Sequence, residues 1–136
     1  MDTLLFEWIT LLVRWAHIIT AIAWIGASFY FVWLDMSLEE ASPNKKNLRL
    51  QGELWAIHGG GIYEVQKYEL APPVMPKKLH WFKWEAYSTW LTGTALLVLV
   101  YYGRAQTYLV DDGSFIRDPT TAVLASIGFL ISGVLG

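Results

Sequence analysis

The feature that most constrains this chain is a set of three long apolar segments. The first runs from Trp15 to Leu34, and His17 is its only residue that ionises near neutral pH. As a helix rising about 1.5 Å per residue, it covers the roughly 30 Å of a hydrocarbon core. The second is Ala86–Gly103 and the third is Pro119–Gly136. We therefore predict membrane-spanning helices over about residues 4–34, 86–103 and 119–136.

The composition agrees with a lipid environment and excludes several classes of function. Of the 136 residues, 54% are hydrophobic, eight are Trp and seven are Tyr, more than an ordinary soluble domain carries. Ten basic residues against twelve acidic ones give no basic patch, so a nucleic-acid partner is not expected. The absence of cysteine excludes disulfides, thiolate metal sites and covalent haem attachment in this chain. Any haem here must be held non-covalently.

The predicted fold is an all-α membrane protein, a polytopic bundle of transmembrane helices with three spans in this chain. Seven Lys and Arg residues lie in loop 35–85, against Arg104 and Arg117 in the next loop, so loop 35–85 should be cytoplasmic. The N-terminus and the Asp111-Asp112 loop should then be periplasmic. A helix that ends at Gly136 without a polar flank leaves carbonyls unsatisfied in lipid. We therefore expect a truncated chain.

Loop 35–85 carries signals of its own. Leu54–His58 and Ile62–Tyr68 are rich in Ile, Val, Trp and Tyr, and they flank Gly59-Gly60-Gly61. This pattern is typical of a small β-hairpin, although a helix ending at His58 fits nearly as well. From His80 to Trp90 the density of Trp and Tyr indicates an interfacial belt that leads into the second helix.

One face of the first predicted helix collects most of its polar groups. Alternating steps of three and four residues from His17 trace that face. Because the other faces are apolar, we expect this one to look into the bundle interior. Its members are Thr10, Arg14, His17, Ala21, Trp24, Ser28, Phe31 and Asp35.

His17 lies near the middle of the first span, where an ionisable residue costs roughly 2.5–3.5 kcal/mol and persists mostly where it has a partner or a role. Imidazole is a common ligand of haem iron, and the small residues Gly26 and Ala27 leave space for a haem. A histidine hydrogen-bonded to another helix fits equally well. Arg14, one turn away, can pair with a haem propionate or an anionic substrate, or extend to the membrane surface.

The remaining candidates lie in or next to the long loop. His80 is a second candidate iron ligand, with a proton relay or an interfacial residue as alternatives. Glu64 and Glu85 are candidate proton acceptors. The acidic and histidine residues lack an H-E-x-x-H spacing, so a zinc or di-iron site is not predicted. His58 precedes three glycines, but no G-x-S-x-G elbow accompanies it, which argues against a hydrolase.

Several long stretches, in order, resemble the membrane-bound urate oxidase (urate hydroxylase) family. This resemblance implies a multi-pass protein of the bacterial inner membrane, with a periplasmic N-terminus and a C-terminal cytochrome c domain that carries haem c beyond this chain. It also implies an oxidoreductase that converts urate to 5-hydroxyisourate and passes electrons to cytochrome c. Whether this N-terminal portion is active alone is left open. The matching stretches are Arg14–Ile19, Ala23–Phe31, Gly52–Gly61, Tyr63–Tyr68 and Leu79–Tyr87.

A shorter likeness, a histidine followed by an aromatic helix rich in small residues, is shared with the haem-binding protoporphyrinogen oxidase membrane family. It implies that His17 binds the iron of haem b, and His80 remains the second candidate ligand. Urate is a flat anion, which Arg14 can pair with and Trp24 can stack on. The alternative is a haem b-binding electron-transfer or anchor protein of the membrane without urate chemistry of its own. A structural subunit would hold no chromophore.

Overall fold

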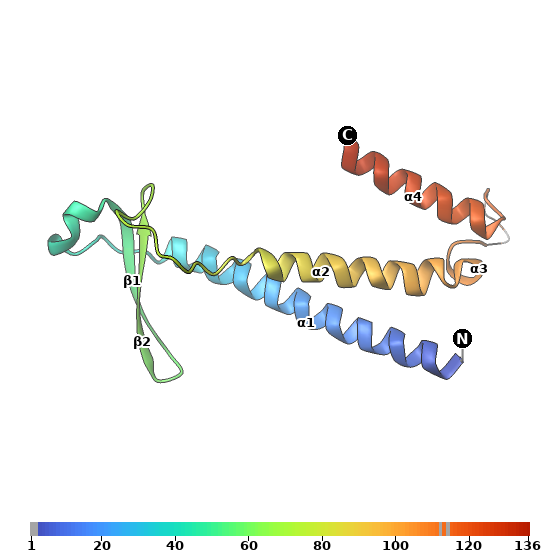
Figure 1. Cartoon of the computed structure of the whole chain (residues 1–136), viewed down its shortest axis with the longest axis horizontal. Helices are drawn as coiled ribbons and strands as arrows, with labels where there is room; N and C mark the ends of the chain where they lie inside the picture. The colour runs from blue at the N-terminus through green and yellow to red at the C-terminus, as the bar shows by residue number, and fades with distance from the viewer. Residues whose placement is uncertain (1–2, 112, 114) are drawn as a thin grey trace. The chain divides into compact units, whose positions relative to one another are not determined.

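The chain forms two compact units in the computed structural model, which describes residues 3–111, 113 and 115–136. Asp112, in the loop expected to be periplasmic, lies outside the described residues. We call residues 1–23 and 83–136 the helical unit, and residues 24–82 the hairpin unit. Helix α1 (Thr3–Met36) contributes to both (Figure 1).

The helical unit is built on an antiparallel pair of helices. The N-terminal part of α1 lies beside α2 (Lys83–Leu96), which passes directly into a π-helical segment, η2 (Leu97–Tyr102) (Figure 1). The short helix α3 (Ala105–Tyr108) follows, and then α4 (Pro119–Leu135). A contact between the hydroxyl groups of Tyr102 and Ser126, 3.0 Å apart, connects η2 to α4.

Helix α4 begins with an N-cap at Asp118. The Asp118 Oδ2 atom accepts hydrogen bonds from the hydroxyl and the backbone N–H of Thr121, both at 2.7 Å. Pro119 occupies the first helical position, where its missing N–H costs nothing. The hydroxyl and then the backbone N–H of Thr121 hold the pKa of Asp118 below its ordinary value.

The predicted all-α bundle with three spans is wrong. Among the described residues, only α1 is long and apolar enough to cross a membrane. The 14 residues of α2 cover about 21 Å and the 17 residues of α4 about 26 Å, both less than the roughly 30 Å of a hydrocarbon core. The prediction treated residues 86–103 as one α-helix, whereas regular α-helical geometry ends at Leu96. Part of the chain is also β-structure.

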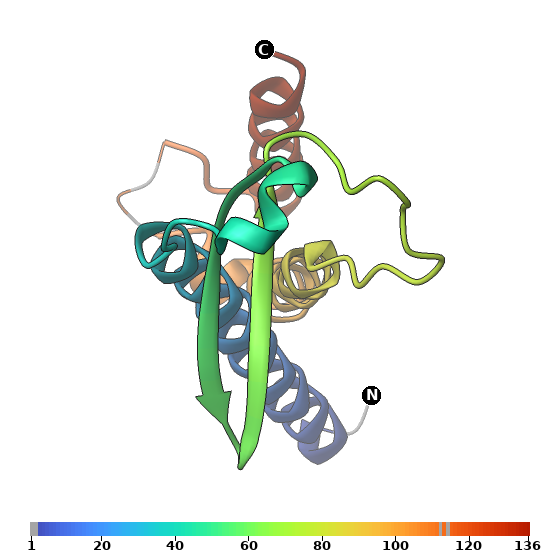
Figure 2. The same cartoon turned by 90° about the vertical axis from the view of Figure 1, so that its left-hand side faces the viewer.

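The hairpin unit contains the C-terminal part of α1, a 3₁₀ turn, η1 (Pro43–Leu48), and two antiparallel strands. Strand β1 (Leu50–His58) pairs with β2 (Gly61–Tyr68) in one two-stranded sheet. Gly59 and Gly60 join them with φ angles of 57° and 80°, values that favour glycine in a tight hairpin turn. Of the two alternatives for this part of the loop, the structure has the hairpin, which Figure 2 shows with both strands facing the viewer.

A buried carboxylate fixes η1 to the hairpin. Glu53 is only 5% exposed, and its Oε1 atom accepts a hydrogen bond from the backbone N–H of Ser42 and another from the Ser42 hydroxyl. Its Oε2 atom lies 2.6 Å from the Lys45 ammonium, which also pairs with Glu64 and lies over the Trp55 ring. Lys45 first, and then Ser42, hold the pKa of Glu53 below its ordinary value.

We expect the stability of the hairpin unit to depend on the charge of Glu53. Because the pKa is lowered in the folded state, the stabilisation is complete above the ordinary value of 4.5 and is lost as the pH falls through the lower folded value. Glu53→Gln should remove this dependence and weaken the unit at pH 7. The measurement is hydrogen exchange at the paired backbone amides of Glu39 and Glu53. Glu40→Gln, at an exposed position, is the control.

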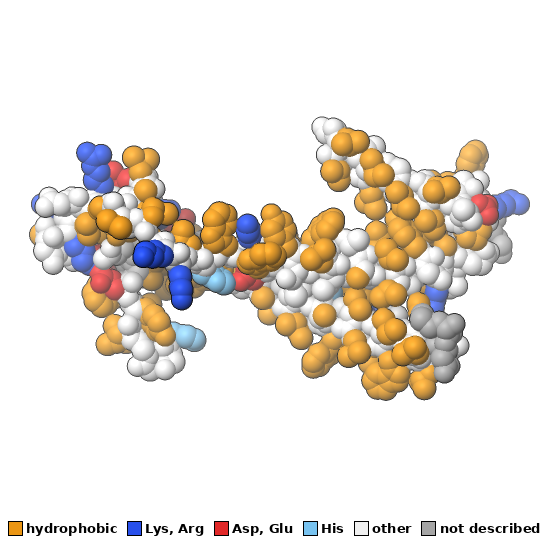
Figure 3. All heavy atoms as spheres, in the orientation of Figure 1, with side chains coloured by type: hydrophobic (Ala, Val, Ile, Leu, Met, Phe, Trp, Pro, Cys, Tyr) orange, Lys and Arg blue, Asp and Glu red, His pale blue; other side chains and the backbone are white. Residues whose placement is uncertain are grey.

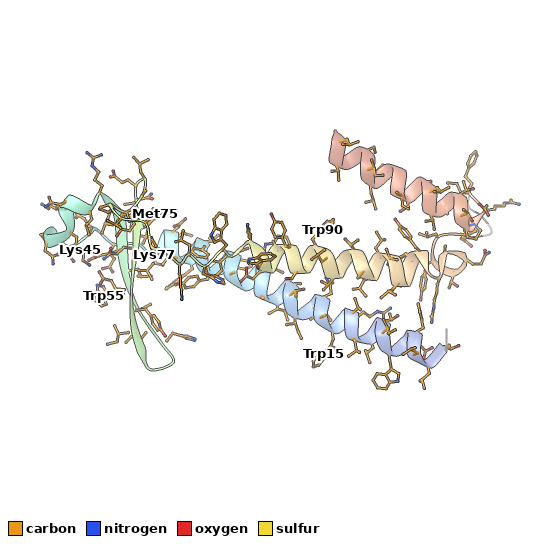
Figure 4. The ribbon with its side chains drawn as sticks, in the orientation of Figure 1. Trp15, Lys45, Trp55, Met75, Lys77 and Trp90 are labelled. Carbon is orange, nitrogen blue, oxygen red and sulfur yellow. The ribbon has the colours of Figure 1, made fainter. Side chains whose placement is uncertain are left out.

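The large apolar side chains of the helices lie mostly on outer faces. Trp15 on α1 and Trp90 on α2 are each 67% exposed and point away from the line where the two helices meet (Figure 4). Figure 3 shows hydrophobic side chains spread over the visible face of the helices. Such continuous apolar surface is typical of a contact with lipid or with further protein.

Candidate functional site

A polar seam runs between α1 and α2 in the helical unit. We give this name to Thr10, Arg14, His17 and Thr20 of α1 together with Thr92 of α2. The Nδ1 atom of His17 lies 3.0 Å from the Thr92 hydroxyl, and the Thr20 hydroxyl lies 3.3 Å from the same oxygen. The stripe predicted on the first helix therefore faces a neighbouring helix at His17, whereas its members Trp24, Ser28, Phe31 and Asp35 are exposed.

The hydrogen bonds of the Thr92 hydroxyl indicate which nitrogen of the His17 ring carries the proton. The single hydroxyl proton of Thr92 is donated to its own helix, where the carbonyl oxygen of Ser88 lies at 2.8 Å. The Thr92 oxygen then accepts from His17, so we assign the Nδ1–H tautomer to the neutral ring. The Nε2 atom carries the lone pair. An anchored Nδ1 and an available Nε2 are typical of a histidine that binds a metal.

Gly93 allows the imidazole of His17 to approach α2 closely. A Cβ atom at position 93 would lie 3.1 Å from Cε1 of His17 and 3.6 Å from Nδ1. Nine in ten real Cβ contacts are longer than the first distance, so the ring would have to shift by a few tenths of an ångström to admit a Cβ atom. Glycine at position 93 therefore lets the ring lie this close to α2, where it contacts Thr92.

A cavity of about 360 Å³ opens along the same helix on the N-terminal side of His17. We call it the arginine pocket because Arg14 and Arg104 both line it. Its remaining lining residues come from α1, η2 and α3. The complete set is Phe6, Glu7, Thr10, Leu11, Arg14, Val100, Arg104 and Tyr108.

The arginine pocket combines positive charge with aromatic faces. The guanidinium of Arg104 lies over the Phe6 ring, 4.7 Å from Cζ to the ring centroid, and the ring of Tyr108 lies 5.7 Å from that of Tyr101. Neither Arg14 nor Arg104 forms an ion pair or a side-chain hydrogen bond with any residue that the structure describes. The pocket therefore offers two guanidinium groups, one carboxylate and flat hydrophobic surfaces.

His17 is the residue of this unit that could hold the iron of haem b. The imidazole is partly buried, its Nδ1 atom is anchored to Thr92, and its Nε2 atom is left as a donor. One ligand of the iron can therefore come from this unit. No cluster of three or more acidic or histidine side chains with metal-binding geometry occurs in the described part of the chain.

The other predicted site residues belong to different surroundings. Trp24 and His80 are in the hairpin unit, where Trp24 lines a shallow apolar groove and the ring of His80 packs edge-on against Phe82 at 4.6 Å. Glu64 pairs with Lys45 on the hairpin, and Glu85 is partly buried in the first turn of α2. The arginine pocket contains Arg14 but neither Trp24 nor the two candidate proton acceptors.

Four residues of this region were missed from the sequence. Arg104 was considered only as a loop charge, and Thr92, Gly93 and Tyr108 were not considered at all. A signal was available for two of them, because a hydroxyl followed by glycine in an apolar helix marks a place where another helix can approach closely and be hydrogen-bonded. No local pattern indicates that Arg104 and Tyr108 meet α1.

Comparison with known proteins gives one clear family. A family model described as urate oxidase N-terminal matches residues 3–135, almost the whole chain. No curated protein and no solved structure matches it. The resemblance inferred from the sequence is therefore confirmed.

Proposed function

Because the chain belongs to the urate oxidase N-terminal family, we propose that it is the N-terminal membrane portion of an enzyme that oxidises urate to 5-hydroxyisourate and passes the electrons to a cytochrome c. In this reaction the urate anion and one water molecule give 5-hydroxyisourate, one proton and two electrons. The protein must therefore hold an anion, accept a proton and provide a route for electrons.

The observation that carries this proposal is the position of the polar seam. Arg14 lines a pocket able to receive an anion, and His17 lies three residues further along the same helix, a rise of about 4.5 Å. An anion-binding side chain and a potential redox ligand are thus neighbours on one helix. This is the combination that the reaction requires.

Three residues of α1 have distinct roles in the proposal. Arg14 pairs with the urate anion through its planar guanidinium. Glu7, the carboxylate among the pocket residues, is proposed in place of Glu64 and Glu85 as the acceptor of the proton released from water. His17 offers its Nε2 atom to the iron of haem b and keeps Nδ1–H on Thr92. When bound, haem b supplies a one-electron relay toward the cytochrome c.

Helix α1 supports a location in the membrane. Its 34 residues are about 51 Å long, enough to cross the hydrocarbon core and extend beyond it. We place the protein in the bacterial inner membrane on this basis, with the N-terminus on the periplasmic side because Lys and Arg are concentrated in the loop after α1.

The test is a reduced-minus-oxidised absorbance spectrum of the full-length protein in membranes, recorded with and without urate, together with assay of 5-hydroxyisourate. We expect urate to reduce the haem and to be consumed. Haem that is present but indifferent to urate would instead support the alternative, an electron-transfer or anchor protein. A preparation with no chromophore and no urate turnover would contradict both.

A further inference from the structure

The arginine pocket has an excess of positive charge that the described protein does not neutralise. Two guanidinium groups and one carboxylate line the same cavity, and neither Arg14 nor Arg104 has an acidic partner among the described residues. Like charges that face one cavity repel each other, and an anion between them removes that cost. The formal excess is one positive charge, which matches a monoanion.

The surfaces around the two arginines favour a flat ligand. The Arg104 guanidinium is held against apolar surface by its contact with Phe6 at 4.7 Å, and Tyr108 adds a second ring to the lining. A planar guanidinium forms paired hydrogen bonds in its own plane, so it selects ligands whose acceptor atoms are coplanar. A volume of about 360 Å³ lies within the range of small-molecule sites.

Glu7 and Thr10 distinguish this pocket from a general anion site. A carboxylate repels phosphate or sulfate, but it accepts hydrogen bonds from the N–H groups of a heterocyclic anion. The Thr10 hydroxyl donates to the Phe6 carbonyl at 2.8 Å, so its oxygen remains an acceptor facing the same cavity. The lining therefore suits a ligand that carries negative charge and N–H donors in one plane.

The backbone that carries Arg104 to α1 is unusual. The six residues of η2 are π-helical, and Val100 of this segment lines the pocket. π-Helical turns are rare and occur frequently at functional sites, because the wider turn changes the direction of the side chains that follow. This feature is independent of the charge argument and points to the same pocket.

We propose that the arginine pocket binds a planar heterocyclic monoanion between Arg14 and Arg104, with Phe6 supporting the Arg104 guanidinium, Tyr108 along one flat face of the ligand, and Glu7 and Thr10 accepting its N–H groups. Identification of this anion as urate rests on the proposed function. Arg104 is then a substrate-binding residue contributed from beyond η2.

The experiment measures equilibrium binding to the full-length protein, reduced beforehand with dithionite so that urate cannot be oxidised. Urate and orotate, both planar monoanions, are titrated into wild type, Arg104→Gln, Arg104→Lys and Arg117→Gln. Arg117→Gln is the matched control because it removes an exposed arginine outside the pocket. Thermal unfolding shows that each variant is folded.

We expect Arg104→Gln to weaken binding about 10- to 100-fold, as for the loss of charged hydrogen bonds. Arg104→Lys keeps the charge but loses the planar fork, so its affinity should lie between those of Arg104→Gln and wild type, and Arg117→Gln should bind as wild type does. Equal affinities in all four proteins would overturn the proposal. So would displacement of urate by inorganic phosphate as effectively as by orotate.

The experiment gives different results if the pocket proposal is wrong and if the proposed function is wrong. If wild type oxidises urate and Arg104→Gln binds it unchanged, the pocket proposal falls and the enzyme assignment stands. If wild type neither oxidises nor binds urate, while orotate binding depends on Arg104, the enzyme assignment falls and the pocket proposal stands.

Discussion

Replacing His17 with alanine in the full-length enzyme is expected to remove haem b and, with it, the reduction of cytochrome c by urate. The imidazole is the donor that the polar seam offers to iron, with Nδ1 held 3.0 Å from the Thr92 hydroxyl. Haem b content is measured by the pyridine haemochrome assay, and reduction is measured by absorbance after addition of urate. Urate binding should persist because the arginine pocket is intact.

Thr92→Val provides the matched variant for this prediction. It keeps the imidazole and removes only the acceptor of the Nδ1–H hydrogen bond, a change that typically costs about 10- to 100-fold in metal affinity. We therefore expect partial loss of haem b in Thr92→Val and complete loss in His17→Ala. An unchanged haem content in His17→Ala would show that His17 is not the ligand.

Gly93→Val should destabilise the helical unit and displace His17 from Thr92. The new Cβ would lie 3.1 Å from Cε1 of His17, and the γ-methyl groups need further space, so the ring must move off α2. Overpacking of this kind typically costs about 1–3 kcal/mol. The thermal unfolding temperature and the urate-dependent rate should fall together, since displacement of His17 breaks its hydrogen bond to Thr92.

Gly128→Val, in α4 of the same unit, is the control for the intrinsic cost of valine in an apolar helix. A Cβ atom at Gly128 has no neighbour within 4 Å among the described residues, yet the change in helix propensity is comparable. Gly128→Val should therefore lower the unfolding temperature less than Gly93→Val and leave the urate-dependent rate near that of wild type. Equal effects of the two variants would mean that close packing of His17 on Gly93 contributes nothing.

The sequence predicted α1 and the part of its polar face around His17, because both follow from local periodicity. A residue every three or four positions lies on one side of a helix, and in such an apolar segment the polar side can only face protein or water. Arg14 and His17 were identified in this way, and the structure places both along the seam with α2.

The errors arose where geometry departs from a regular helix. Hydropathy registers residues 86–103 as one long uncharged segment, but it cannot show that α-helical hydrogen bonding ends at Leu96 and that a wider turn follows. The prediction of the second span failed for this reason, and Arg104 was missed because the same turn carries it to α1. Trp24 was grouped with Arg14 by periodicity, yet it lies ten positions further along α1 and lines a different groove.

For the hairpin, the sequence left two secondary structures open. Its apolar stretches fit a strand or a helix, and the turn with positive φ angles at Gly59 and Gly60 makes them a pair of strands. The role of Glu53 was not predicted, because Ser42 and Lys45 are brought to it by η1, a short polar segment whose sequence does not indicate a contact with the hairpin.

The measurement that tests the central claim most directly is a cryo-electron microscopy structure of the full-length protein, reduced and saturated with urate. The account predicts planar ligand density in the arginine pocket, with the guanidinium groups of Arg14 and Arg104 at hydrogen-bonding distances of about 2.7–3.2 Å from it. Urate bound at a site to which no residue of this chain contributes would contradict the account.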